Sequence, residues 1–317
     1  MKKLSDYRSL FPICEDSIYL NHAGVAPTSL PVCDAVHKWM LELARRGIHM
    51  GANWEEQADE VRASAGRLVG AGAHEISFIR NTSHGLGLVA EGIDWQSGDE
   101  VICCPEVEYQ SNVYVWQHLS HYGVRVAEVE AQEGGVTVEA VERVRTDKTR
   151  LLAVSAVQFA TGHKTDLKAL GDYCKKHDLL FCVDGIQWLG SAPLDVKEYG
   201  IHFLAADSHK WMLGVVGIGL LYIDESMLTR LRPVLVGWKS TTAPLNSRMA
   251  CATRRGILHS CVPIRLRYLS CLALQRRRWM KMRIYMWLPM PSIFRFVYMY
   301  FLKLGLALSR RQQPLGH

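Results

Sequence analysis

The stretch "IHFLAADSHKWMLG", residues 201–214, joins an apolar run to a histidine and a lysine. The run "IHFLAA" is typical of a buried strand, and the polar residues after it come where that strand would end. In an open sheet of parallel strands, ligands bind in the crevice beyond the carboxyl ends of the strands. We therefore expect Lys210, and the residues just before it, Asp207, Ser208 and His209, to face such a crevice.

Apolar runs of similar length recur through the first part of the chain and alternate with amphipathic segments. The segment 165–178 has Leu167, Leu170 and Tyr173 at helical spacing, with Asp166 in its first turn and lysines in its last, as the helix dipole favours. Strands that alternate with such helices are typical of an α/β domain. The sequence therefore predicts a mainly parallel sheet of seven strands, formed by "EISFIR", "DEVICC", "VRVAEVE", "LLAVSAVQ", "LLFCVD", "HFLAA" and "GIGLLYI".

Two further strand ends carry polar residues that would share the crevice with Lys210. The run "LLFCVD" ends in Asp184, and Gln187 follows three residues later. The stretch "EISFIRNTSHGLGLVAEGI" predicts a strand, a turn and a helix whose first turn holds Thr82 and Ser83. Hydroxyls and N–H groups at a helix start bind anions such as phosphate. Each residue also has a plainer interpretation: Lys210 as a loop lysine, Asp184 as a helix cap, Gln187 as a surface amide, and Thr82 and Ser83 as N-caps without a ligand.

A lysine, a carboxylate and a phosphate cradle at three strand ends match the needs of pyridoxal phosphate. The lysine amine would form a Schiff base, and the carboxylate would keep the pyridine nitrogen protonated so that the ring accepts electrons. The lysine can act as a base at neutral pH only if its pKa falls from about 10.4, and burial beside a cationic ring can lower such a pKa by as much as ~3 to 5 units. We therefore predict pyridoxal phosphate as the cofactor.

The chain resembles, motif by motif, the class V aminotransferase family of fold-type I pyridoxal phosphate enzymes. That family includes cysteine desulfurases, selenocysteine lyases, kynureninase and isopenicillin N epimerase-like proteins. The resemblance implies a fold-type I large domain, here residues 1–245, and the homodimer that is usual in the family. It runs over roughly three quarters of the chain, through "YLNHAGVAPTS", "RNTSHG", "DEVICCPEVEYQSN", "VDGIQ", "SHKW" and "VGWKSTT".

The resemblance implies a role for each matching residue. Lys210 would form the aldimine with the cofactor, Asp184 would pair with the pyridine nitrogen, and Gln187 would donate a hydrogen bond to the phenolic oxygen. Tyr109, where many relatives have a histidine, would stack on the ring, although a phenol of pKa near ~10 is a poorer proton shuttle than imidazole. Phe159 stands where many desulfurases have an asparagine that touches the phenolic oxygen. The phosphate would be held by Thr82, Ser83, Ser208 and His209.

The fate of the substrate depends on residues that the sequence does not show plainly. In cysteine desulfurases, a loop cysteine in the C-terminal third accepts sulfur, and an arginine of the small domain binds the substrate carboxylate. Neither motif is recognisable here. We therefore expect an aminotransferase-like or epimerase-like enzyme that acts on an amino acid. Two alternatives stay open: an enzyme like cysteine desulfurase or selenocysteine lyase, and a truncated, inactive relative that binds the cofactor.

The charge is divided unevenly along the chain. The formal net charge is +6, but residues 246–317 hold fourteen Lys and Arg and no Asp or Glu, which leaves 23 basic against 31 acidic residues in 1–245. We expect this tail not to form a native-like domain, so that the family's small C-terminal domain is absent or disrupted. One interpretation is a frameshift near residue 245. The others are a genuine but unusual domain and a membrane-seeking tail, whose apolar stretch 292–308 is interrupted by Arg295 and Lys303.

The cysteines, the N-terminus and the distribution of basic charge argue against several classes of function. Nine cysteines form no CxxC pair and no Cys/His cluster at zinc spacing, so we expect reduced thiols and no metal site. The N-terminus lacks the apolar core of a secretory signal, which predicts a cytoplasmic protein. Basic charge without a patterned, aromatic-interleaved face argues against a nucleic-acid partner, and the interrupted apolar stretch argues against a membrane partner.

Overall fold

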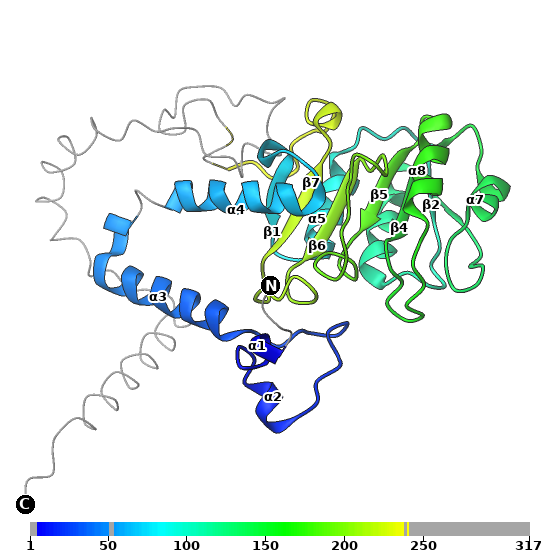
Figure 1. Cartoon of the computed structure of the whole chain (residues 1–317). Helices are drawn as coiled ribbons and strands as arrows, with labels where there is room; N and C mark the ends of the chain where they lie inside the picture. The colour runs from blue at the N-terminus through cyan, green and yellow to red at the C-terminus, as the bar shows by residue number, and fades with distance from the viewer. Residues whose placement is uncertain (1–4, 51–53, 238–239, 241–317) are drawn as a thin grey trace, which may run out of the picture. The chain divides into compact units, whose positions relative to one another are not determined.

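The computed structural model of the chain describes residues 5–50, 54–237 and 240 (Figure 1). By the pattern of its internal contacts the chain divides into two units, residues 1–264 and 265–317, and all described residues belong to the first. The predicted tail, residues 246–317, lies outside the described residues. The domain boundary expected at residue 245 therefore stays a prediction.

The described residues contain a seven-stranded mixed sheet with the strand order β1-β7-β6-β5-β4-β2-β3. Every neighbouring pair from β6 to β3 is parallel, whereas β7 runs antiparallel to both β1 and β6. The mainly parallel seven-stranded sheet expected from the sequence is confirmed. Its strands are β1 (Ile76–Ile79), β2 (Glu100–Cys103), β3 (Arg125–Glu128), β4 (Thr149–Ser155), β5 (Leu180–Asp184), β6 (Phe203–Asp207) and β7 (Gly219–Ile223).

Helices lie between several successive strands as crossovers, because parallel neighbours cannot be joined by a tight turn. The predicted helix within 165–178 is confirmed as α8, with Asp166 as its N-cap and an Asp166 side chain that accepts from the Ala169 N–H at 2.9 Å. The α-helices are α1 (Ser5–Arg8), α2 (Ile13–Asp16), α3 (Leu30–Arg46), α4 (Trp54–Val69), α5 (Thr82–Gly92), α6 (Tyr114–Gln117), α7 (Val138–Val144) and α8 (Leu167–Lys176). Short 3-10 turns are η1 (Gly47–Met50), η2 (Ala73–Glu75), η3 (Gln110–Asn112), η4 (His118–Tyr122) and η5 (Glu225–Met227).

Both faces of the sheet are buried, which explains why its central strands are apolar without a polar alternation. Successive side chains of a strand point to opposite faces, and β4 shows the consequence. Leu151 and Ala153 belong to the core cluster that includes side chains of α5 and α6, whereas Leu152 and Val154 belong to the cluster that includes α7 and α8. The two clusters hold the strands rigidly, so the residues at the strand ends have defined positions.

Candidate active site

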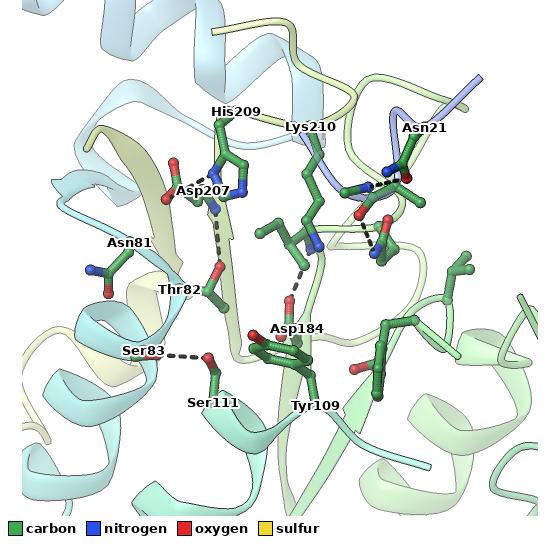
Figure 2. Close-up of a pocket in the computed structure, with 17 residues that line it drawn as sticks. Asn21, Asn81, Thr82, Ser83, Tyr109, Ser111, Asp184, Asp207, His209 and Lys210 are labelled. Atoms are coloured by element: carbon green, nitrogen blue, oxygen red, sulfur yellow. Dashed lines mark hydrogen bonds and ion pairs between the residues drawn. The ribbon is translucent and has the colours of Figure 1, made fainter. Parts of the chain in front are cut away.

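A cavity of about 460 Å³ lies at the carboxyl ends of β4, β5 and β6, beside the start of α5 (Figure 2). These three strands end in Ser155, Asp184 and Asp207, and all three residues line the cavity. This is the edge of a parallel sheet at which ligands bind. The structure brings all of the predicted site residues except Ser208 to this cavity, namely Thr82, Ser83, Tyr109, Asp184, Gln187, His209 and Lys210.

Lys210 and Asp184 face each other inside the cavity. Figure 2 shows the Lys210 side chain pointing into the pocket with its amine toward Asp184. The Asp184 carboxyl is 2% exposed, and burial raises its pKa to about 7; the Ile186 N–H and Lys210 oppose this shift, and Glu108 adds to it. Burial also lowers the pKa of Lys210, against the effect of Asp184 and Asp207. Both groups can therefore exchange protons nearer neutral pH than in water.

The start of α5 forms one wall of the cavity. Asn81 is its N-cap, since the Asn81 side chain accepts a hydrogen bond from a first-turn N–H at 2.8 Å. Neither neighbouring hydroxyl is the cap: Thr82 Oγ1 accepts from the Asp207 N–H at 3.1 Å, and Ser83 Oγ lies 2.7 Å from Ser111 Oγ. Thr82 thus fastens α5 to the end of β6. The helix start and two serine hydroxyls are the donor set that a phosphate group binds.

Asp207 and His209 form a second pair at the end of β6. Asp207 is 3% exposed, and its Oδ2 lies 3.0 Å from His209 Nδ1, although the two groups are not aligned as a hydrogen bond. Asp207 Oδ1 is buried and has no hydrogen-bond partner among the described residues. Buried polar atoms are normally paired, so this oxygen can accept a hydrogen bond from a ligand in the cavity.

Ser208 differs from the expectation drawn from the sequence. It does not line the cavity, and its hydroxyl donates to the carbonyl oxygens of Val215 and Ile218, at 3.1 and 2.6 Å. The Gly214 N–H in turn donates to the Ser208 carbonyl at 2.8 Å. The hydroxyl therefore closes the loop between β6 and β7, and the assignment of Ser208 to the phosphate is not supported.

Gln187 connects the site to the N-terminal segment. Its Nε2 donates to the Ala23 carbonyl at 3.0 Å, and its Oε1 accepts from Trp211 Nε1 at 3.1 Å. The Trp211 ring also stacks on His22, with 5.4 Å between the ring centroids. Gln187 is thus fixed in place with one Nε2 proton left for a ligand. Its bond to the cofactor stays a prediction.

Tyr109 and Phe159 stand together at the cavity. Their rings meet edge to face, with centroids 5.1 Å apart and an angle of 82° between planes. Tyr109 is 49% exposed and Phe159 is 43% exposed, so neither is a core aromatic. An exposed aromatic ring at the wall of a cavity can stack on a flat ligand.

Sequence reasoning gave no site role to several residues that line the cavity. Motif positions could have suggested some of them, since Asn81 directly precedes a helix start and Ser111 follows Tyr109 by two residues. Asp207 was expected to face the crevice, but no role was given to it. Others reach the cavity through strand pairing or through the return of the N-terminal segment. The residues without an assigned role are Asn21, Ala23, Gly24, Asn81, Ser111, Ser155, Val157, Phe159, Ile186 and Asp207.

The cavity fits pyridoxal phosphate by the chemistry of its lining. It offers an amine for the aldehyde, a buried carboxyl for the pyridine nitrogen and a helix start with hydroxyls for the phosphate. Its volume lies within the usual range of small-molecule sites, about 300–1,000 Å³. Fold and site together define a protein of the fold-type I pyridoxal phosphate class.

Comparisons with known proteins lead to the same class. The sequence profile described as aminotransferase class V matches residues 18–256. A protein of Methanothermobacter thermautotrophicus named "Probable cysteine desulfurase" is 32% identical over 240 residues, covering 74% of this chain and 60% of that protein. An uncharacterised aminotransferase of Bacillus subtilis is 27% identical, over 78% of this chain and 66% of its own. The solved apo cysteine desulfurase of Thermococcus onnurineus superimposes with a TM-score of 0.74 at 27% identity, over 83% of this chain and 67% of that one.

The chain belongs to the class V aminotransferase family. The resemblance seen in its motifs is thereby confirmed. The chain spans about three fifths of the length of the first curated relatives that it matches. Within residues 5–50 and 54–237, no helix is both long and apolar enough to cross a bilayer.

Proposed function

We propose that this protein is a pyridoxal phosphate-dependent enzyme that acts on an amino acid, with Lys210 as the residue that attaches the cofactor. One observation carries the proposal: the Lys210 amine points across the cavity toward the buried carboxyl of Asp184. Cofactor attachment and pyridine protonation need these two groups on opposite sides of one small ligand. Family membership agrees with this assignment.

When bound, the cofactor would supply a protonated ring that withdraws electrons from the substrate's α-carbon. The residues of the chain would hold the cofactor and move the protons. Asp184 would hold a proton at the pyridine nitrogen, and the start of α5 with Thr82, Ser83 and His209 would anchor the phosphate. Once released by the incoming amino group, the Lys210 amine would remove the α-proton, a role that its lowered pKa suits. Tyr109 would pack against the ring face.

The names of the relatives favour cysteine desulfurase as a second candidate for the reaction. That reaction needs a reactive thiol at the substrate. Among the described residues no cysteine lines the cavity, and burial raises the pKa of Cys103, Cys104, Cys174 and Cys182. The C-terminal cysteines, Cys251, Cys261 and Cys271, lie outside the described residues. Transamination or epimerisation thus remains our main proposal, with sulfur transfer as the alternative.

Further expectations from the sequence stay predictions. They are a homodimer with the active site at the interface, a cytoplasmic location, and no nucleic-acid or membrane partner. An inactive, cofactor-binding relative also remains an alternative.

Cofactor attachment can be tested with the purified full chain. Pyridoxal phosphate is added, the visible absorbance band of the bound cofactor is recorded, and borohydride reduction followed by peptide mass mapping locates the modified lysine. We expect the label on Lys210 and no band in Lys210→Ala. The matched control is Lys168→Ala, since Lys168 pairs with Asp172 on the exposed surface of α8. A band that persists in Lys210→Ala would refute the assignment of the lysine.

The reaction type is tested on the same samples. Incubation with single amino acids, each with a 2-oxo acid present to accept the amino group, is followed by three readouts: formation of the keto acid of the added amino acid, loss of optical rotation, and sulfide release from cysteine under reducing conditions. Keto acid or racemised product supports the main proposal, and sulfide alone supports the desulfurase alternative. A Lys210-bound cofactor without any turnover supports the inactive-relative interpretation.

A further inference from the structure

A second buried carboxylate, Glu108, lies beneath the cavity without lining it. Glu108 is 3% exposed and stands directly before Tyr109 in the loop that follows β2. A buried carboxylate is costly unless its oxygens are paired. The burial of this carboxylate below the cavity therefore has to be explained.

The Glu108 carboxylate accepts four hydrogen bonds. Oε1 accepts from the Ser155 N–H and from Gln158 Nε2, both at 2.7 Å. Oε2 accepts from Asn112 Nδ2 at 2.9 Å and from the Ser155 hydroxyl. Ionised carboxylates are acceptors only, with about four lone-pair sites, so this arrangement is complementary to the charged form. These bonds lower the pKa of Glu108, whereas burial raises it by more.

The four bonds connect the loop around Tyr109 to the end of β4 and the residues just after it. Ser155 is the last residue of β4, Gln158 follows it, and Asn112 closes η3. The Asn112 N–H also donates to the Tyr109 carbonyl at 2.8 Å. The backbone on both sides of Tyr109 is therefore fastened to the end of β4, which determines where the Tyr109 ring stands.

Glu108 and Asp184 share a neighbour, Ser155. Ser155 pairs with Asp184 in the register of β4 and β5, and the Ala156 N–H donates to the Asp184 carbonyl at 2.9 Å. The residue that gives Glu108 two of its four hydrogen bonds thus stands directly beside Asp184. A negative charge there opposes ionisation of a second carboxyl, in agreement with the contribution of Glu108 to the raised pKa of Asp184.

We propose that Glu108 is a positioning residue of the active site: it fixes Tyr109 at the cavity wall, and it places a negative charge near the proton that Asp184 holds. The proposal rests on the proposed function, since it gives that proton a use at the pyridine nitrogen. A purely structural role would require the four hydrogen bonds but not the charge, and the two can be separated by experiment.

The test compares three variants of the full chain. Glu108→Gln removes the charge while keeping the shape, and Glu108→Asp keeps the charge while shortening the reach. The matched control, Glu106→Gln, removes a charge from the same loop at an exposed position. Two pH titrations are measured for each: the stability of the cofactor-free protein in urea, and the visible band after pyridoxal phosphate is bound.

In Glu108→Gln we expect the midpoints of both titrations to move to lower pH by about one unit, because a like charge has been removed from the neighbourhood of Asp184. Glu106→Gln should leave both midpoints unchanged. In Glu108→Asp we expect the wild-type midpoints but a severalfold weaker affinity for pyridoxal phosphate, since Tyr109 is less firmly held. Equal midpoints in wild type and Glu108→Gln would overturn the proposal.

The variants remain informative if Glu108→Gln does not fold. Glu108→Asp then tests both parts of the proposal. A titration midpoint shifted by about one unit in that variant would contradict the part on the charge. An unchanged affinity for pyridoxal phosphate would contradict the part on Tyr109. The cofactor-free titration also separates this inference from the proposed function. If pyridoxal phosphate does not attach to Lys210, the function fails, yet the coupling between Glu108 and Asp184 is still measured.

Discussion

Replacing Asp184 by asparagine should stabilise the cofactor-free protein at neutral pH. The carboxyl is 2% exposed, and burial raises its pKa from 3.8 to about 7. An unfolded chain ionises the same carboxyl near its ordinary pKa. Between these two values the folded protein binds more protons than the unfolded chain, so this group makes stability fall as the pH rises. Asparagine keeps the shape and carries no proton to lose.

The size of the effect follows from the pKa difference. One pKa unit corresponds to about 1.4 kcal/mol, so a rise from 3.8 to about 7 sets an upper limit of about 4 kcal/mol on the loss of stability above neutral pH. The asparagine amide can still accept from the Ile186 N–H through Oδ1, but its buried NH₂ group has to find a partner, which costs roughly 1–3 kcal/mol. We therefore expect a net gain of about 2 kcal/mol near pH 8 and no gain near pH 4.

The assay is urea unfolding of wild type and Asp184→Asn without cofactor, at several pH values between about 4 and 8. The difference in the free energy of unfolding should grow with pH and level off above about pH 7. The same variant should lose turnover, because asparagine cannot hold a pyridine nitrogen in the protonated form. If the difference between the two proteins does not change with pH, or if the variant is less stable near pH 8, the carboxyl is not the strained group that its burial implies.

Three substitutions test the packing that positions the site. Gly171→Ala should cost about 1–3 kcal/mol in urea unfolding, because a Cβ there would lie 1.9 Å from the Tyr199 carbonyl oxygen; an unchanged midpoint would contradict this contact. Thr82→Val should cost about 1–3 kcal/mol in thermal unfolding and weaken phosphate binding, since it leaves the buried Asp207 N–H unpaired; equal melting curves would show another acceptor. Leu86→Ala, in the fully buried face of α5, should cost about 2–5 kcal/mol in urea, and a loss below about 1 kcal/mol would mean that the core relaxes there.

The central strands were predictable from the sequence because they are buried on both faces and therefore read as apolar runs. The pairing of the strands was not predictable from the sequence. Nothing local in "GIGLLYI" indicates that β7 runs antiparallel between β1 and β6, since apolar periodicity carries no information about direction. The pairing is decided by crossovers and packing, which involve residues far apart in the chain.

The candidate site was likewise predictable from the sequence only in part. Lys210, Asp184 and the start of α5 were predictable because a functional group at a strand end is visible in a single short stretch. The assignment of Ser208 is not supported by the structure, because its neighbours in sequence line the cavity whereas its own hydroxyl closes the following loop. Glu108 reads as an ordinary loop acid in "EVEYQSN", and only its hydrogen bonds to Asn112, Ser155 and Gln158 in the folded chain reveal its burial.

The charges of the site bear on how it binds its ligand. Two buried carboxyls, Asp184 and Asp207, act on the amine of Lys210, and Glu108 acts on Asp184. Burial, with a further contribution from Glu108, raises the proton affinity of Asp184. Below about pH 7 this carboxyl therefore carries a proton. A ligand that places a basic ring nitrogen beside it can take up that proton within the site, without drawing one from solvent, and the resulting ion pair lowers the pKa of Asp184 again. The raised proton affinity of Asp184 thus favours a ligand that places a basic ring nitrogen beside it.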